Sequence, residues 1–141
     1  MSIDDQLCFA LHAASRAMTA AYAPLLAELD LTYPQYAVML VLWECDGTSV
    51  STIGERLHLD SATLTPLIKR LEVRGVVERR RSTEDERVVN IFLTTAGKRL
   101  ERKAADIPRC MLDKAKLSLA DMRALRTQLQ ALTVQLRSAD S

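Results

Sequence analysis

Two short amphipathic segments, followed at once by a basic hairpin pattern, constrain the fold more strongly than any other feature of the sequence. The first segment, STIGERLHL, starts at Ser51. The second runs from Asp60, a good helix-capping residue, to Gly75, which suits a helix C-terminus. Its apolar side chains recur at helical spacing, at Leu64, Leu67, Ile68 and Leu71. Two short helices joined by a few residues predict a helix-turn-helix, although Pro66, which lacks a backbone N–H, should bend or delay the second helix.

Two β-branched runs, VVERRR and RVVNIFL, flank the polar turn STEDE and predict a β-hairpin. The hairpin cations are Arg79, Arg80, Arg81 and Arg87. An arginine just after the tip fits a narrow DNA minor groove, and Asp85 could orient the Arg87 guanidinium through a bidentate pair. A helix-turn-helix followed by a basic hairpin is the layout of a winged helix, so the sequence predicts binding to double-stranded DNA.

In this layout the second helix of the pair would enter the major groove. The candidate contacts are the hydroxyl groups of Ser61, Thr63 and Thr65 and the cations Lys69, Arg70 and Arg74. For a lone helix, a satisfied helix start and solvated cations explain such residues better. The net charge of +1 does not favour DNA either, but Lys and Arg crowd between Lys69 and Lys103, and the basic hairpin decides the comparison in favour of DNA.

Apolar stripes predict two helices before this module. Residues 7–25 carry apolar side chains at steps of four and three, and Asp4 or Asp5 could cap that helix. The next helix opens with Thr32 and Gln35 at capping-box spacing and is nearly all apolar, which indicates burial on most sides.

Two more helices are expected after the hairpin. Thr94 or Thr95 would cap the first, and Pro108 marks a kink or break in it. The last helix begins near Ser118 and carries a leucine stripe one helix wide.

The predicted fold is therefore mainly α, of the α+β class, in a single domain over residues 1–141. A winged helix-turn-helix occupies residues 31–94, with its wing hairpin at about 76–93. Residues 1–30 and 95–141 form a helical dimerisation region, because their apolar faces exceed what a small winged helix can cover. A homodimer would bury this surface and place two recognition helices on an inverted-repeat operator. An intramolecular core is the alternative, and the two are compatible.

Several classes of protein are not expected. The sequence lacks a basic start with a long apolar run, and YAVMLVLW is far shorter than the ~20 residues of a membrane-spanning helix. The expectation is a cytoplasmic protein without a membrane partner. Three cysteines and two separated histidines match neither a secreted disulfide framework nor a zinc site, so no metal or cofactor is expected.

Cys8 lies about one turn into the first predicted helix. A cysteine on an apolar helix is more often an inert small residue. Three features oppose that interpretation. A position near a helix N-terminus favours the thiolate. His12 and Ser15 follow at i+4 and i+7, and Tyr22 and Tyr33 could present hydroxyls if the second helix folds back on the first. Of the other cysteines, the one ending the second helix is expected to be structural, and Cys110, near a helix break, to be accessible.

Four stretches carry a family resemblance over essentially the whole chain. They are LCFALHAASRAMTAAYAPLL, LDLTYPQYAVMLVLWE, LHLDSATLTPLIKRLEVRG and the DER of the wing. With them the sequence resembles the MarR family, and within it the organic-hydroperoxide-resistance repressors. LCFAL together with LTYPQY is specific to the hydroperoxide branch, whereas DER and the later Leu93, Thr94 and Gly97 are typical of MarR proteins in general. A proline in the recognition helix is also usual in the family.

The resemblance implies a redox sensor. Cys8 would be the thiolate that an organic hydroperoxide oxidises to a sulfenic acid, with Tyr22 and Tyr33 orienting it. In one subgroup the acid then condenses with a small cellular thiol. In the other it forms a disulfide with a cysteine of the partner subunit, and Cys110 matches that position. The disulfide would move the dimer helices and separate the recognition helices. His12 departs from the family, in which an aromatic residue is common there.

The leading hypothesis is therefore a dimeric repressor that organic hydroperoxides release from DNA, and not an enzyme. One alternative is a MarR-type repressor released by a small phenolic ligand, with structural cysteines. A more distant alternative is a thiol peroxidase that uses Cys8 with His12.

Overall fold

The computed structural model describes residues 1–138, and the chain divides into two compact units, Met1–Ala105 and a second one that begins at Asp106. The first unit opens with a 3-10 turn, η1 (Ile3–Asp5), and helix α1 (Leu7–Ala27). Neither predicted aspartate caps α1. Both lie in η1, which Ser2 caps, and the extended backbone of Gln6 separates η1 from α1.

Helix α2 (Tyr33–Glu44) forms the centre of the core, as its apolar sequence predicts. The expected capping box is present: the Gln35 N–H donates to Thr32 Oγ1 at 3.3 Å, and the Thr32 N–H donates to Gln35 Oε1 at 3.0 Å. This exchange satisfies Gln35, which is buried. Val38, Met39 and Leu42 have no exposed surface, so α2 is covered on most sides.

The helix-turn-helix consists of α3 (Val50–Leu57) and α4 (Ser61–Val73). Helix α3 begins slightly before the expected Ser51, because Ser49 is its cap. Asp60 caps α4 as predicted, accepting from the Thr63 N–H at 2.8 Å. Pro66 does not delay α4. It stands on the exposed side of a continuous helix, where its ring avoids the packed face and only one intrahelical bond is lost.

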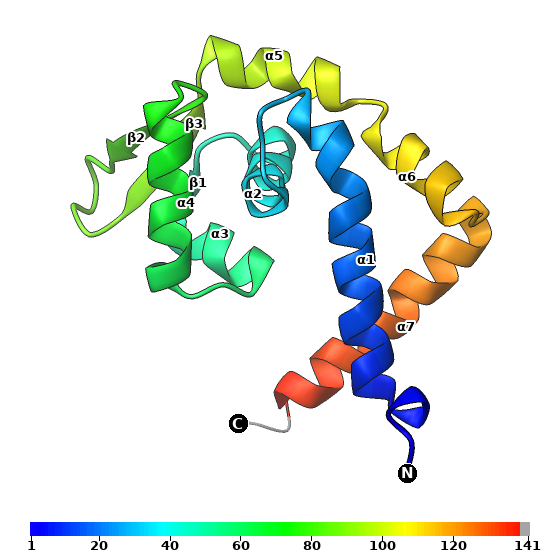
Figure 1. Cartoon of the computed structure of the whole chain (residues 1–141). Coiled ribbons are helices and arrows are strands. Elements are labelled where there is room, and N and C mark those ends of the chain that lie inside the picture. Colours follow the sequence, from blue (N-terminus) through cyan, green and yellow to red (C-terminus); the bar gives the residue numbers. More distant parts are fainter. Residues whose placement is uncertain (139–141) are drawn as a thin grey trace. The chain divides into compact units, whose positions relative to one another are not determined.

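A three-stranded antiparallel sheet completes the winged helix (Figure 1). Its strands are β1 (Thr48–Ser49), β2 (Val77–Arg81) and β3 (Val89–Leu93), in the order β1-β3-β2. Strands β2 and β3 form the predicted hairpin, in which Arg79 pairs with Ile91. Val77 and Ile91 turn inward and are buried, whereas the hairpin arginines stay exposed. The predicted fold class, mainly helical with a winged helix, is confirmed.

Helix α5 (Thr95–Ala104) follows the hairpin directly, and Thr94 caps it by accepting from the Gly97 N–H at 3.1 Å. Gly97 lies so close to Val76, the residue before β2, that a Cβ at position 97 would stand 2.1 Å from the Val76 carbonyl oxygen. The indole N–H of Trp43 donates to the Gly97 carbonyl at 3.0 Å. These contacts join the start of α5 to α2 and to the hairpin.

The second unit holds α6 (Ile107–Ala115) and α7 (Leu119–Ser138). The expected break is present, but it falls at residues 105–106. Pro108 lies in the first turn of α6, where a missing N–H costs little. Ser118 caps α7, accepting from the Asp121 N–H at 3.0 Å. None of the described helices is long and apolar enough to cross a membrane.

Candidate nucleic-acid interface and cysteine environment

Helix α4 is amphipathic, with one buried apolar face and one exposed polar face. Leu64, Ile68 and Leu71 face the core and are at most 1% exposed. The other face is exposed and carries Ser61, Thr63, Thr65, Lys69 and Arg70, which are five of the predicted contacts. The sequence thus folds into a helix whose free face presents hydroxyl groups near its start and cations further along, which suits contact with bases and phosphates.

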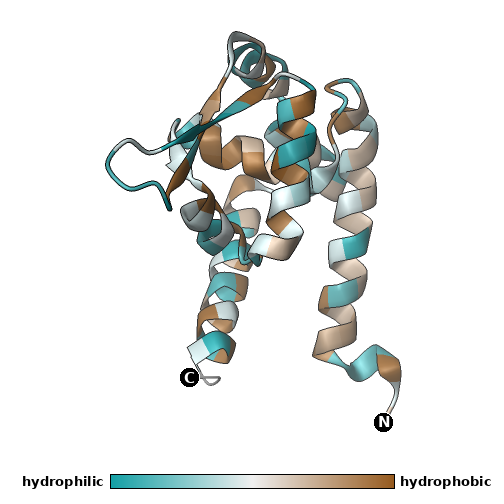
Figure 2. Cartoon of the chain, turned by 90° about the vertical axis from the view of Figure 1, so that its left-hand side faces the viewer, coloured by the Kyte–Doolittle hydropathy of each residue, from teal (hydrophilic) through white to brown (hydrophobic). Residues whose placement is uncertain are grey.

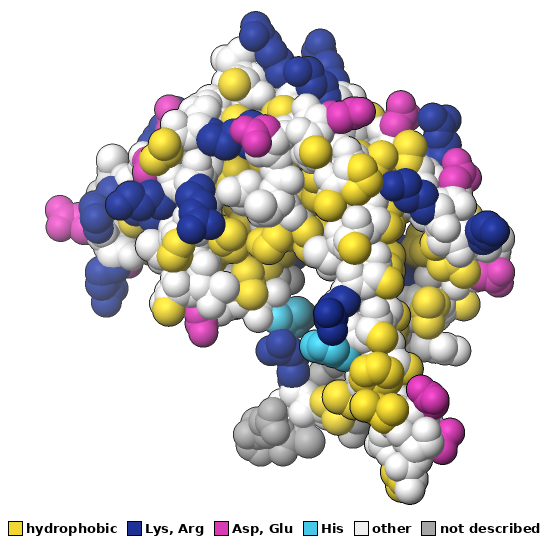
Figure 3. Space-filling view, in the orientation of Figure 1, with side chains coloured by type: hydrophobic (Ala, Val, Ile, Leu, Met, Phe, Trp, Pro, Cys, Tyr) yellow, Lys and Arg dark blue, Asp and Glu magenta, His cyan; other side chains and the backbone are white. Residues whose placement is uncertain are grey.

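The wing presents an oriented guanidinium. Arg87 forms the predicted bidentate pair with Asp85: Nε lies 3.2 Å from Oδ1, and Nη2 lies 3.3 Å from Oδ2. The hydrogen bonds from Arg87 hold the pKa of Asp85 below its usual range, so the carboxylate stays ionised. The Arg87 side chain is nevertheless 91% exposed. Figure 2 shows the wing loop as hydrophilic, and in Figure 3 Lys and Arg side chains gather over the hairpin and α4.

Other hairpin cations make contacts within the chain. Arg80 stacks over the Phe92 ring, with its guanidinium carbon 4.4 Å from the ring centre, and pairs with Glu78. Arg79 lies 3.9 Å from a Glu72 carboxylate oxygen of α4. The Arg80 contacts lie within the hairpin and the Arg79 contact joins it to α4, so the number of arginines alone overstates the charge available to DNA.

Arg74 is the predicted contact that the structure places differently. Its guanidinium turns back to the loop between α1 and α2, donating to the Asp30 carbonyl and, at 3.0 Å, to the Leu29 carbonyl. The side chain is 28% exposed. Two of its N–H groups thus have carbonyl partners within the chain, whereas the cations of Lys69 and Arg70 are exposed. Contact of Arg74 with DNA stays a prediction.

Cys8 is the second residue of α1 and is exposed. His12 is also exposed, one turn further along α1, and no hydrogen bond joins the two side chains in the described part of the chain. The thiol is therefore accessible. Cys45, expected to be structural, is exposed at the end of α2, so core packing does not explain it. Cys110, the fourth residue of α6, is half-buried.

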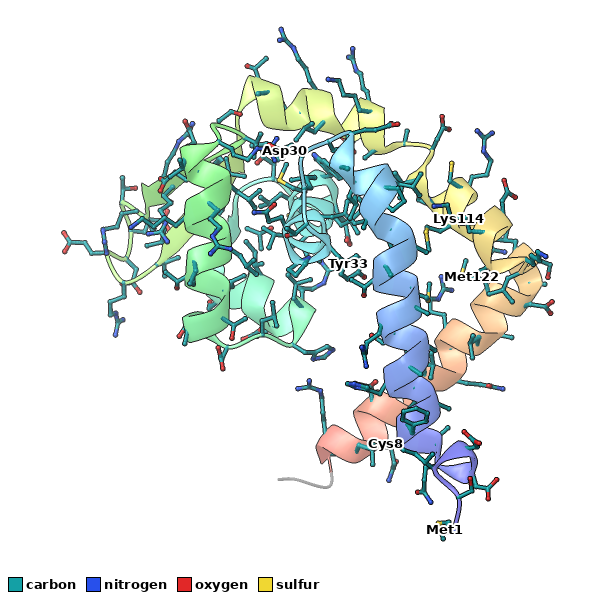
Figure 4. The ribbon with its side chains drawn as sticks, viewed as in Figure 1. Met1, Cys8, Asp30, Tyr33, Lys114 and Met122 are labelled. Atoms are coloured by element: carbon teal, nitrogen blue, oxygen red, sulfur yellow. The ribbon has the colours of Figure 1, made fainter. Side chains whose placement is uncertain are left out.

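Within one chain, the predicted tyrosines lie far from Cys8. Fourteen positions of α1 separate Cys8 from Tyr22, which is about 21 Å along a helix axis. Tyr33 packs on Tyr22, with ring centres 5.1 Å apart. Figure 4 shows Cys8 and Tyr33 at different levels along α1. The structure thus brings the two tyrosines together, but not with the thiol of the same chain.

Tyr22 and Tyr33 belong to an aromatic cluster that the sequence predicts only in part. Tyr36 is buried between them and Trp43, with ring centres 5.8 Å from Tyr22 and 6.2 Å from Trp43. Burial raises the pKa of Tyr36 to about 12, and burial, followed by the neighbouring Tyr33, raises the pKa of Tyr22. Both hydroxyls stay protonated at neutral pH and can donate. The i, i+3 spacing of Tyr33 and Tyr36 on an apolar helix was the available signal.

Comparison with known proteins identifies the family. The model of the family described as "Transcriptional regulator SarA/Rot" matches residues 20–104. The organic hydroperoxide resistance transcriptional regulator of Bacillus subtilis is 49% identical over 132 residues, which are 94% of this chain and 90% of that protein.

The chain belongs to the MarR/SarA family of transcriptional regulators.

Solved structures of family members agree with this assignment. Reduced AbfR bound to DNA superposes with a TM-score of 0.84 at 30% identity, covering 99% of this regulator and 95% of that chain. Disulfide-formed AbfR has a TM-score of 0.66 at 31% identity, covering 97% and 91%. AbfR is a protein of Staphylococcus epidermidis. This regulator is therefore similar to a protein that has been solved both on DNA and with a disulfide.

Proposed function

We propose that this regulator binds an inverted-repeat operator as a homodimer, and that oxidation of Cys8 by organic hydroperoxides releases it. The observation that carries the proposal is an exposed thiol in the first turn of α1. A relative that is 49% identical is named for organic hydroperoxide resistance, which supports the choice of oxidant. The winged helix of the same chain supplies the surface that would be released.

The DNA-binding part rests on α4 and the wing. Helix α4 would enter the major groove with Ser61, Thr63 and Thr65 near base edges, and with Lys69 and Arg70 near phosphates. Arg87 would reach the adjacent minor groove, held in direction by Asp85. This arrangement contacts a short stretch of duplex, so a second copy is needed for a full operator.

Exposed apolar side chains on two helices support the dimer. On α1, Leu7 is 64% exposed and Met18 is 48% exposed. Helix α7 has no buried residue among those described, and it exposes Leu119, Leu125, Val134 and Leu136. A second copy of the chain would cover this surface and relate two recognition helices by a two-fold axis.

The dimer also bears on how the thiol would be oriented. Since α1 keeps Cys8 about 21 Å from Tyr22 of the same chain, the tyrosines can act on Cys8 only from the partner subunit. In such a site the hydroxyls of Tyr22 and Tyr33 would donate to the thiolate and favour its charged form. His12, one turn from Cys8, would be a further polar neighbour of the thiol.

The proposed reaction is a two-electron oxidation. The Cys8 thiolate attacks the terminal oxygen of the hydroperoxide, an S–O bond forms as the O–O bond breaks, and the leaving alkoxide takes a proton from water, so that the products are a sulfenic acid and an alcohol. A second thiol can then attack the sulfenic sulfur, forming a disulfide and releasing water. We assign this second step to Cys110 of the partner subunit. The solved disulfide form of AbfR supports a disulfide as the end state.

Duplex-binding measurements test the proposal. An operator is first selected from a random DNA pool with reduced protein, and the dissociation constant is then measured before and after cumene hydroperoxide. We expect the oxidant to weaken binding of the wild type and of Cys45→Ser, a matched control with an exposed cysteine. It should leave Cys8→Ser unaffected. Equal weakening of Cys8→Ser, or none in the wild type, would refute the redox function.

A further inference from the structure

The Arg74 side chain attaches the C-terminal end of helix α4 to the loop that follows α1. Arg74 is the C-cap residue, which directly follows the last residue of α4, Val73. Its guanidinium donates to the carbonyls of Leu29 and Asp30 in the loop that follows α1, and its Nε lies 3.6 Å from an Asp30 carboxylate oxygen. Figure 4 labels Asp30 in this loop. The two backbone carbonyls, rather than the 90% exposed Asp30 side chain, are the principal partners.

The loop that receives Arg74 is itself an extension of α1. The N–H groups of Leu29 and Leu31 both donate to the Leu26 carbonyl, at 3.0 and 3.1 Å, and the N–H of Asp30 donates to the Ala27 carbonyl at 3.0 Å. Leu29 and Leu31 are buried. The loop is thus bonded back onto the last turn of α1, and a shift of α1 along or about its axis would carry the Arg74 partners with it.

The same end of α4 is held on its other side by α5. Thr94, which caps α5, donates its hydroxyl to the Gly75 carbonyl at 2.6 Å, and its N–H donates to the Val76 carbonyl at 3.1 Å. Helix α4 therefore ends between two attachments, one to α1 and one to α5. Its other end has the Asp60 cap and the hydroxyl groups of Ser61, Thr63 and Thr65, which are proposed to lie near base edges.

We propose that Arg74 is a positioning residue that couples α1 to the recognition helix. It sets the orientation of α4 through the two carbonyls and does not contact DNA. Because Cys8 lies at the opposite end of α1, Arg74 is then one connection by which a change at the thiol reaches α4, beside the packing of α2 on both helices. This last step rests on the proposed redox function; the positioning of α4 does not.

Two variants of Arg74 separate positioning from a direct phosphate contact. Arg74→Ala removes the guanidinium, and Arg74→Lys keeps its charge but loses the planar fork that reaches two carbonyls at once. Binding of a labelled operator duplex to the full-length reduced protein is measured at several salt concentrations. Lys69→Ala, which removes an exposed cation of α4, serves as the phosphate-contact control, and Asp30→Asn removes the carboxylate but keeps both carbonyls.

We expect both Arg74 variants to weaken operator binding by roughly two- to thirtyfold, with the salt dependence of wild type. They should also lower the factor by which cumene hydroperoxide weakens binding. Lys69→Ala should reduce the salt slope by about 1 and keep that factor. Asp30→Asn should behave like wild type. Thermal unfolding of each variant identifies any that does not fold, and Arg74→Lys decides the question if Arg74→Ala is one of them.

Two results would overturn the proposal. If Arg74→Lys binds like wild type while Arg74→Ala loses about 1 from the salt slope, then Arg74 contacts a phosphate. If both variants bind like wild type, Arg74 positions nothing. A wild type that binds the operator equally before and after oxidant refutes the redox function alone, since the affinities and salt slopes still decide the role of Arg74. A wild type that binds no duplex refutes both.

Discussion

At the scale of the residue, Gly97 is required by space rather than by backbone conformation. A Cβ at this position would stand 2.1 Å from the Val76 carbonyl oxygen, which is backbone and cannot rotate away. Gly97→Ala should therefore push α5 from the hairpin and lower the free energy of unfolding by about 1–3 kcal/mol. Chemical denaturation measures the loss. Ala96→Ser, at an exposed neighbouring position, is the control, and a Gly97→Ala protein as stable as this control would contradict the close approach.

Asp60 gives the stability of the chain a defined pH dependence. Hydrogen bonds from Thr63, that of its backbone N–H first, hold the pKa of Asp60 below its usual range in the folded chain. The ionised carboxylate therefore stabilises the folded state above the unfolded-state pKa of about 3.9. This contribution is lost as the pH falls through the lower folded-state value.

Asp60→Asn isolates this contribution, because Asn also caps helices but does not titrate in this range. Urea denaturation of both proteins from neutral to acidic pH should show wild type more stable at neutral pH and the difference vanishing in acid. A difference that stays constant with pH would contradict the assignment of Asp60 as the cap of α4.

At the scale of the element, the contribution of the wing to operator binding can be tested apart from that of helix α4. Arg87→Ala removes the exposed guanidinium that Asp85 orients, and we expect operator affinity to fall by about tenfold or more with the fold intact. Fluorescence anisotropy measures the affinity, and circular dichroism checks the fold. Arg80→Lys is a useful comparison, because Arg80 already stacks on Phe92. Wild-type affinity in Arg87→Ala would mean that the wing does not touch DNA.

The elements themselves were predictable where local chemistry determines them. The Thr32–Gln35 capping box, the Asp60 cap and the Gly75 helix end depend on residues close together in the sequence, and all three are present. Strand β1 was not predicted, because two residues carry no periodicity and pair only through the register of β3. The carbonyl partners of Arg74 could not be predicted, because they lie more than forty positions away in the sequence.

At the scale of the whole molecule, the sequence predicts which residues would form a redox site but not how they are arranged. The sequence predicts that Tyr22 and Tyr33 approach Cys8 if the second helix folds back on the first. Helix α2 does pack beside α1, but next to Tyr22, far along the helix from Cys8. Residues on one long helix cannot converge, so a site containing all three needs two chains. No local pattern in a single sequence reports this.

Cys110 is expected to form a disulfide with Cys8 of the other subunit when the protein is oxidised. After one equivalent of cumene hydroperoxide, non-reducing electrophoresis of wild type should show a band of dimer size, because Cys8 and Cys110 would be joined between subunits. The band should be absent in Cys110→Ser and kept in Cys45→Ser. A wild type that stays at monomer size would contradict the assignment of the second step to Cys110 of the partner subunit.

The most direct test of the account is a titration of the reduced wild-type protein on its labelled operator with cumene hydroperoxide, with fluorescence anisotropy and free thiols measured in the same sample. The account predicts that DNA is released as the Cys8 thiol is consumed, and that the complex of Cys8→Ser stays bound throughout. Cys8 that is fully oxidised in a complex still holding its DNA, or a Cys8→Ser complex released at the same oxidant concentration, would contradict it.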